Sequence, residues 1–327
     1  MLTVYHSRDG MKIAILIFCS LLLVPCFAPA QEIHENVDIQ LVNVYLAAMD
    51  AKGRFVTDLK SNELQLKEDG IPQSIATFAN FAQDPSNKLG EENVPLTVGL
   101  VIDTSQSMAQ AVSGEQQKID IVKNAAFRII DELRPDDHIV LVSFNDTPTE
   151  DSPLTTDFKQ MRQDLLFEDV KSGSTALYDA VYFALQKIKD ESGRKLIVVC
   201  SDGEDTSSVL RFDEVVNNLI ASDVTVLAFG TMALSSTSLR GHYALQKLAE
   251  ASGGYAFFPT SLKELDAVMD RLREGMRSQY SLAYRPTRSA ADGTWRKIEI
   301  TTSRPGLKLR YREGYQMTGF ASRAAKK

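Results

Sequence analysis

Residues 96–107 read LTVGLVIDTSQS, an apolar run that leads directly into an aspartate and two serines. The first seven of these residues carry no charge, and an apolar run of this kind is typical of a parallel strand that helices cover on both faces. Three later runs have the same character: HIVLVSFN (138–145), KLIVVCSDG (195–203) and VTVLAFG (224–230). Amphipathic helical patterns occupy Lys118–Leu133, Thr175–Lys189, Phe212–Ala221, Leu239–Ala251 and Leu262–Gln279. The alternation predicts an α/β fold over residues 95–279, with a doubly wound, mostly parallel open sheet.

Shorter, strand-like patterns lie on both sides of this region. Residues 31–82 alternate polar and apolar side chains, and strand character returns in residues 280–318. Because neither segment has enough strands to bury a face by itself, we predict that the two segments pair into one small β-sandwich. The α/β domain is then inserted between them. Residues 83–94 are polar and aperiodic, as linkers are, and residues 319–327 are typical of a solvated tail.

The first thirty residues have the pattern of an export signal. Arg8 and Lys12 supply positive charge before the apolar run Ile13–Val24, and Ala28-Pro29-Ala30 offers a small-residue cleavage site. An apolar run of twelve residues is too short to span a bilayer core of about 30 Å. We therefore expect cleavage before Gln31, no transmembrane anchor afterwards, and a periplasmic or extracellular location.

Two alternatives to this N-terminus stay open. Met11 begins a more compact version of the same signal, so translation could start there instead of at Met1. Cys26 could anchor a lipoprotein, but Pro25 directly before it matches such signals poorly, which makes this the weaker alternative.

Composition excludes several classes of protein. The 327 residues include 43 acidic and 36 basic side chains, with a net charge of -7, and a general nucleic-acid binder would need a basic surface instead. The spacing of the three cysteines fits no zinc pattern, and three are too few for a disulfide framework. Cys200, which ends the run LIVVC, is expected to be a buried small hydrophobe.

Oxygen-bearing side chains follow the predicted strands at three places. Asp103, Ser105 and Ser107 stand at alternate positions directly after the first strand. The cluster Ser172-Gly173-Ser174-Thr175 precedes a helix, and Ser201-Asp202-Gly203 follows the strand KLIVVC. Open α/β sheets bind ligands at the carboxyl ends of their strands, so these clusters are predicted to converge.

That convergence offers two carboxylates and three hydroxyls, with no sulfur or imidazole: Asp103, Asp202, Ser105, Ser107 and Thr175. An all-oxygen set suits a hard cation such as Mg²⁺, Mn²⁺ or Ca²⁺. If the hydroxyls are direct ligands and one carboxylate acts through water, the ion stays electron-poor and favours another anionic oxygen. An Asp or Glu of a protein partner could supply it, so that the ion bridges two proteins.

The segments DTSQS, GSTALYDAV and VVCSDGEDT resemble the three parts of the metal ion-dependent adhesion site of von Willebrand factor type A domains. The resemblance covers about residues 94–276, and the KEDG and REGY turns in the flanking segments are similar to those of bacterial secreted proteins with such domains. It implies that Asp103, Ser105, Ser107, Thr175 and Asp202 form the metal site. It also implies divalent-cation-dependent protein binding, in adhesion or assembly, and no catalysis. Asp179 could support the site by hydrogen bonding, or be an ordinary acid on a helix surface.

Two other classes of function are alternatives to protein binding. One is a structural module of an envelope or secreted complex. The other is an enzyme such as a metal-dependent hydrolase, but an aspartyl phosphatase needs a second carboxylate where Ser105 stands. No glycine-rich phosphate loop follows the first strand, and no GxSxG elbow is present. We therefore expect neither catalysis nor a small-molecule substrate.

Overall fold

The computed structural model describes residues 41–81, 94–113, 115–231, 239–259, 261–277, 280–288 and 293–316. All of them belong to one compact unit, Ile39–Lys327. The predicted signal peptide, nearly all of the predicted linker and the predicted tail lie outside the described residues. Within the part that is described, no helix is both long enough and apolar enough to cross a membrane.

A six-stranded sheet forms the centre of the α/β region, in the order β12-β11-β10-β5-β8-β9. Its strands are β5 (Leu96–Asp103), β8 (His138–Phe144), β9 (Pro148–Thr155), β10 (Arg194–Ser201), β11 (Thr225–Gly230) and β12 (Tyr255–Phe257). Neighbouring strands are parallel except β9, which pairs antiparallel with β8 at one edge. Every residue of β5 is buried, as expected of a strand at the centre of a sheet covered on both faces.

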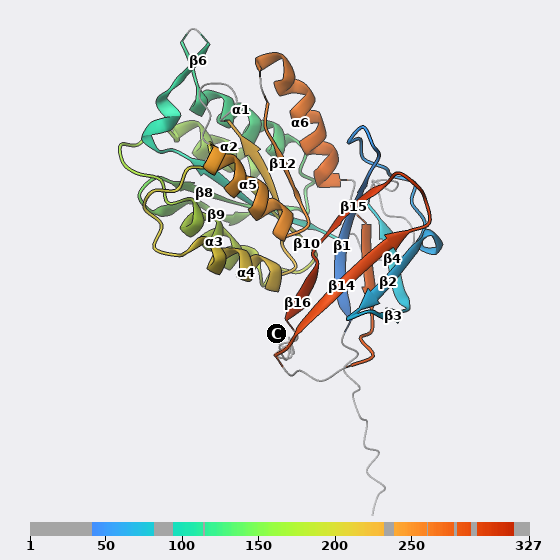
Figure 1. Cartoon of the computed structure of the whole chain (residues 1–327). Helices are drawn as coiled ribbons and strands as arrows, with labels where there is room; N and C mark the ends of the chain where they lie inside the picture. Colours follow the sequence, from blue (N-terminus) through green and yellow to red (C-terminus); the bar gives the residue numbers. More distant parts are fainter. Residues whose placement is uncertain are drawn as a thin grey trace, which may run out of the picture. The chain divides into compact units, whose positions relative to one another are not determined.

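Helices cover both faces of this sheet (Figure 1). One apolar core includes residues of α1 (Lys118–Asp131), α2 (Phe158–Phe167) and α6 (Leu262–Arg277). The opposite core includes residues of α3 (Leu177–Ile188), α4 (Phe212–Ala221) and α5 (Leu239–Ala251). Alternate residues of β5 contribute to the two cores, Leu100 to the first and Val101 to the second. The predicted α/β fold class is therefore confirmed.

Several short elements are absent from the sequence-based prediction. They are the helix α2, the edge strand β9, the strand β12, the hairpin of β6 (Ala111–Ser113) with β7 (Gln116–Gln117), and the 3-10 turns η1 (Ser61–Glu63) and η2 (Gln106–Ala109). In α2 only Met161 and Leu165 are buried, and β9 contains two prolines and one fully buried residue, Ser152. Such elements carry too little apolar periodicity to be found from sequence.

Two four-stranded antiparallel sheets lie outside the α/β region. The first has the order β15-β1-β13-β4 and the second the order β16-β14-β2-β3. Their strands are β1 (Val42–Met49), β2 (Leu64–Glu68), β3 (Ile71–Gln73), β4 (Ile75–Asn80), β13 (Tyr280–Tyr284), β14 (Trp295–Thr302), β15 (Lys308–Tyr311) and β16 (Gly314–Gln316). Side chains of both sheets share one apolar core. The exact limits of the segments, of the linker and of the tail remain predictions.

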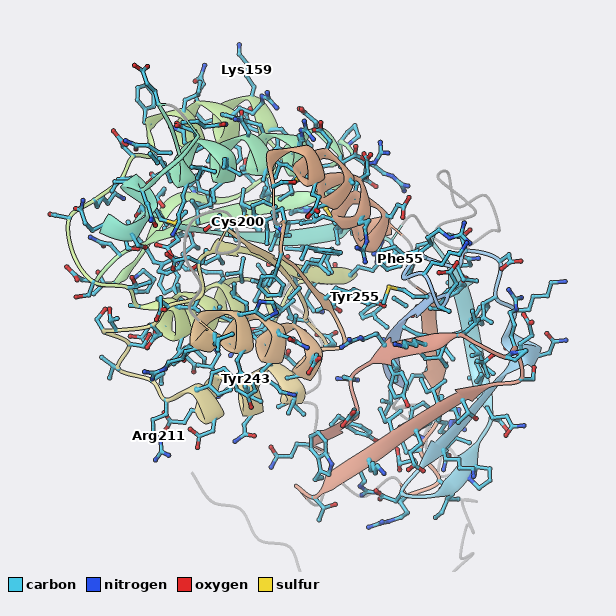
Figure 2. All side chains as sticks on the ribbon, turned by 45° about the horizontal axis from the view of Figure 1, so that its top comes forward. Phe55, Lys159, Cys200, Arg211, Tyr243 and Tyr255 are labelled. Atoms are coloured by element: carbon cyan, nitrogen blue, oxygen red, sulfur yellow. The ribbon has the colours of Figure 1, made fainter. Side chains whose placement is uncertain are left out.

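In both sheets, strands from the N-terminal segment pair with strands from the C-terminal segment. In the first sheet β1 pairs with β13 and β15, and in the second β2 pairs with β14. Contacts also join the sheets to the α/β region: the Tyr45 hydroxyl donates to the Gly193 carbonyl at 3.1 Å, and Arg312 donates to the Ser222 carbonyl at 2.9 Å. The rings of Phe55 and Tyr255 meet edge to face at 5.2 Å (Figure 2).

A buried polar cluster lies among the strands of the two small sheets. One Glu68 carboxylate oxygen accepts hydrogen bonds from the hydroxyls of Tyr284 at 2.6 Å and Tyr315 at 2.8 Å. The other oxygen lies 3.6 Å from the guanidinium of Arg296, and the side chains of both residues are almost fully buried. Glu68 comes from the N-terminal segment and the other three from the C-terminal one, so the cluster links the two ends of the chain.

We expect Glu68→Ala to lower the free energy of unfolding by about 3–5 kcal/mol, because it removes the carboxylate that offsets the buried charge of Arg296. Urea denaturation measures this loss. Glu299→Ala, in the neighbouring strand β14, removes an exposed carboxylate paired with Lys297 and should leave the free energy nearly unchanged. Equal stability of the two variants would show that the Glu68 cluster does not hold the sheets together.

Cys200 lies inside the six-stranded sheet (Figure 2), where burial raises the pKa of its thiol to about 12. A protonated thiol without access to solvent reacts slowly. In a variant with Cys19 and Cys26 replaced by serine, we expect Ellman's reagent to label Cys200 only after unfolding in guanidinium. Rapid labelling of the native protein, at the rate of the unfolded sample, would contradict the predicted buried thiol.

Candidate functional site

The site lies where the parallel strands β5 and β10 end side by side. From the central strand β5 the chain continues to β8 on one side, and it later adds β10 on the other side. The strand order therefore reverses next to β5, which is where open α/β sheets form a crevice for ligands. Asp103 is the last residue of β5, and Asp202 directly follows β10. This topology brings two carboxylates that are far apart in sequence to one edge.

Asp103 is fully buried and is surrounded by hydroxyl groups. Its Oδ1 accepts hydrogen bonds from the Ser105 hydroxyl at 2.6 Å and the Ser105 backbone N–H at 2.9 Å. Its Oδ2 accepts from the Ser201 hydroxyl at 2.6 Å. Burial and the nearby charge of Asp202 raise the pKa of Asp103 to about 6, although the hydroxyls oppose this rise. The carboxylate therefore lies in a place where a nearby cation would be strongly stabilising.

The hydroxyls of Ser105 and Ser107 lie 3.2 Å apart, in the turn that begins at the end of β5. Ser105 precedes the 3-10 turn η2, and Met108 of that turn is completely buried. The buried methionine anchors the turn and leaves Ser107 partly exposed. The spacing of the DTSQS motif thus places two hydroxyl oxygens and one carboxylate together.

The backbone of the loop after β10, which contains Asp202, packs closely against the start of helix α5. Gly203 has φ +83°, and a Cβ atom there would lie 2.3 Å from the Gly241 carbonyl oxygen. A Cβ atom on Gly241 would lie 2.5 Å from the Asp202 carbonyl oxygen. Both distances are shorter than any van der Waals contact, so the first turn of α5 can approach Asp202 only because both residues are glycines.

Thr175 is also buried, and its loop is attached to the loop that follows Asp202. The Thr175 carbonyl accepts from the N–H groups of Thr206 and Ser207, at 2.8 and 3.1 Å. Its own N–H donates to the Thr206 hydroxyl at 3.0 Å. These bonds fix the backbone of Thr175 relative to the loop after β10. Its side-chain hydroxyl makes no hydrogen bond to the other four predicted site residues, all of which lie in the described part of the chain.

Asp179 acts on the same loop. Its two carboxylate oxygens accept hydrogen bonds from the N–H groups of Val209 and Leu210, both at 2.9 Å. Nearby, Asp205 accepts from the Tyr178 N–H at 3.2 Å and from the Ser208 hydroxyl at 2.5 Å. Asp179 therefore ties the loop to helix α3, which is a different role from a hydrogen bond to one of the five predicted site residues.

Two residues that contact the site carboxylates are absent from the predicted metal-site residues. Ser201 donates to Asp103, and its position in the SDG turn could have indicated this. Lys118, the first residue of α1, donates from its ammonium group to Asp202 Oδ2 at 3.1 Å. The side chains of Lys118 and Asp202 are 3% and 6% exposed, so this is a buried ion pair. The sequence around Lys118 indicates only the start of an amphipathic helix, which does not distinguish it from a surface lysine.

The donor set fits a hard divalent cation. Among the described residues, no three His, Cys, Asp or Glu side chains are grouped as a metal site. A cation beside Asp103 would therefore depend on hydroxyl oxygens in addition to carboxylates, and the Ser105 and Ser107 hydroxyls lie there. Oxygen ligands of this kind suit Mg²⁺, Mn²⁺ or Ca²⁺. Part of the negative charge that would hold the ion is already shared with Lys118.

Three solved structures are among those that match part of this chain. The protein BatB of Bacteroides thetaiotaomicron is 19% identical, with a TM-score of 0.44, and the match covers 56% of this chain and all of that one. The PilB minor pilin of Streptococcus sanguinis is 11% identical, with a TM-score of 0.47, and the match covers 57% of this chain and 62% of the pilin. The third structure is proximal thread matrix protein 1 of the mussel byssus, solved with a zinc-occupied MIDAS motif. It is 19% identical, with a TM-score of 0.48, and the match covers 59% of this chain and 48% of that one.

The sequence itself identifies the family. No curated protein matches the chain at a significant level. The profile of the von Willebrand factor type A domain matches residues 97–271, from the first strand of the six-stranded sheet into helix α6. Because this match spans more than half of the 327 residues, the chain belongs to the von Willebrand factor type A domain family.

Proposed function

We propose that this protein is an exported binding protein, which captures an acidic residue of a protein partner through a divalent cation held at the ends of β5 and β10. The buried Asp103 carboxylate, surrounded by hydroxyl oxygens, is the observation that carries the proposal. Asp103, Ser105, Ser107, Thr175 and Asp202 would hold Mg²⁺ or Mn²⁺. Bound there, the ion would supply an electrophilic position for one further oxygen ligand.

The chemistry of the site supports binding better than catalysis. The groups around Asp103 are hydroxyls held by hydrogen bonds to that carboxylate. A nucleophilic serine needs an adjacent base that takes up its proton, most often a histidine. The group that accepts from the Ser105 and Ser201 hydroxyls is instead the Asp103 carboxylate, which we assign to the metal. We therefore propose adhesion or assembly and no turnover of a substrate.

One observation favours the alternative of a structural module. The ammonium of Lys118 already pairs with Asp202, so the lysine could replace the metal instead of coexisting with it. The site would then be a permanent internal ion pair that stabilises the sheet edge. Direct metal titration separates this alternative from metal-dependent binding.

Isothermal calorimetry with Mg²⁺ and with Mn²⁺ is expected to show one binding site per chain. Asp103→Asn keeps the shape of the side chain but removes its charge, and we expect it to weaken binding at least about tenfold, because a carboxylate ligand is lost. Asp190→Ala removes an exposed carboxylate at the end of α3 and serves as the control for net charge.

Wild-type protein that binds neither ion would refute metal-dependent capture and favour the structural module. Equal binding by wild type and Asp103→Asn would place the metal elsewhere. Circular dichroism of both variants checks that the fold is retained.

The proposed export is tested by the mass and N-terminal sequence of the protein recovered from an expressing bacterium. We expect a chain that starts at Gln31, because signal cleavage follows small residues such as Ala28 and Ala30. A Cys26→Ser variant should give the identical product. A heavier, lipid-modified product that disappears in this variant would establish the lipoprotein alternative, and an intact N-terminus would contradict export by this signal.

A further inference from the structure

Lys118 is an unusual residue for its position. It is the first residue of helix α1, and only 3% of its surface is exposed. Its ammonium group lies 3.1 Å from Asp202 Oδ2. Its backbone N–H donates to the Gln110 carbonyl at 3.0 Å, which fixes the start of the helix relative to the loop that contains Ser105 and Ser107. Side chain and backbone of Lys118 thus contact both sides of the candidate site.

Two effects oppose a lysine at this place. Burial of an ammonium group is strongly unfavourable unless a counter-charge is present. In addition, the first turn of a helix carries the positive end of the helix dipole, which disfavours a cation and favours an anion. The buried carboxylates stabilise the lysine against both effects: Asp202 contacts its ammonium group directly, and Asp103 lies next to Asp202. The lysine is therefore positioned by the negative charge of the site and not by the helix.

The formal charges show what this lysine does to a bound ion. The two carboxylates sum to -2, so that a divalent cation alone would neutralise them. With the ammonium of Lys118 included, the site has a charge of -1 before an ion binds and +1 afterwards. The lysine thus weakens the attraction for the metal, and it leaves the loaded site with a positive charge that attracts a carboxylate from outside.

We infer that Lys118 is the fixed counter-charge of the candidate site: its ammonium competes with the divalent cation for Asp202 and thereby lowers the affinity for metal. This inference rests on the proposed function, because it concerns the same cation. A unit charge and a divalent ion that share one carboxylate repel each other by an amount equivalent to about tenfold in affinity or more, even when water screens them. Metal binding is consequently coupled to the binding of an acidic ligand, because the carboxylate of that ligand neutralises the +1 charge of the loaded site.

The test measures Mn²⁺ and Mg²⁺ affinity by calorimetry at one pH near neutrality, without any partner protein. Lys118→Met keeps the length and removes the charge, and Lys118→Gln removes the charge but retains a donor for Asp202. We expect both variants to bind either ion at least about tenfold more tightly than wild type. Two different replacements keep the test valid if one of them misfolds.

Lys123→Met is the matched control. Lys123 lies on the same helix, and its ammonium donates to the carbonyls of Leu166 and Glu168 at 2.9 and 2.7 Å. Its removal changes the net charge by the same amount but leaves Asp202 untouched, so the metal affinity should stay at the wild-type value. Thermal unfolding gives a second readout: Mg²⁺ should raise the midpoint of Lys118→Met by more than that of wild type, because tighter binding stabilises the folded state further.

The outcomes separate this inference from the proposed function. Binding by wild type, with equal or weaker binding by both Lys118 variants, would overturn the inference and leave the metal site in place. Binding by the Lys118 variants but not by wild type would support the inference and contradict metal use by the natural protein. If no form binds either ion, the metal site and the role of Lys118 both fail.

Discussion

The parallel pairing of β5 with β10 is the constraint on which the rest of the site depends, because it brings the buried Asp103 and Asp202 to one edge of the sheet. Two carboxylates in a poorly hydrated place repel each other. The surrounding groups reduce this cost: the hydroxyls of Ser105 and Ser201 donate to Asp103, and the ammonium of Lys118 pairs with Asp202. The site is thus built around negative charge that still attracts a cation.

The same sheet edge is held by backbone packing and by loop-to-loop hydrogen bonds. Gly203 and Gly241 allow the start of α5 to touch the loop of Asp202, and Asp179 fastens the end of that loop to α3. In the two small sheets, the Glu68 cluster joins strands that precede the α/β region to strands that follow it. Both ends of the inserted region are therefore attached to one packed pair of sheets, which limits how far its last helix and first strand can separate.

Much of the fold could be predicted from the sequence. The helices α4 and α5 have the predicted limits, because their apolar residues repeat with the period of a helix and form one buried face. The strand β5 was predictable for a similar reason, since every residue in it is buried. By contrast, α2 and β9 bury only a few side chains. Their positions follow from packing against α1 and β8, which no local pattern shows.

The sequence is sufficient to identify the family, the alternation of strands and helices, and the cluster of Asp103, Ser105 and Ser107, because these depend on side chains that are close together along the chain. The balance of charge at the site follows only from the three-dimensional packing. Lys118 and Asp202 are 84 residues apart, and only the packing of α1 against the edge of the sheet brings them into contact. A buried ion pair depends on the distance between two groups in space and on the exclusion of water from them. The order of residues along the chain specifies neither of these for residues so far apart.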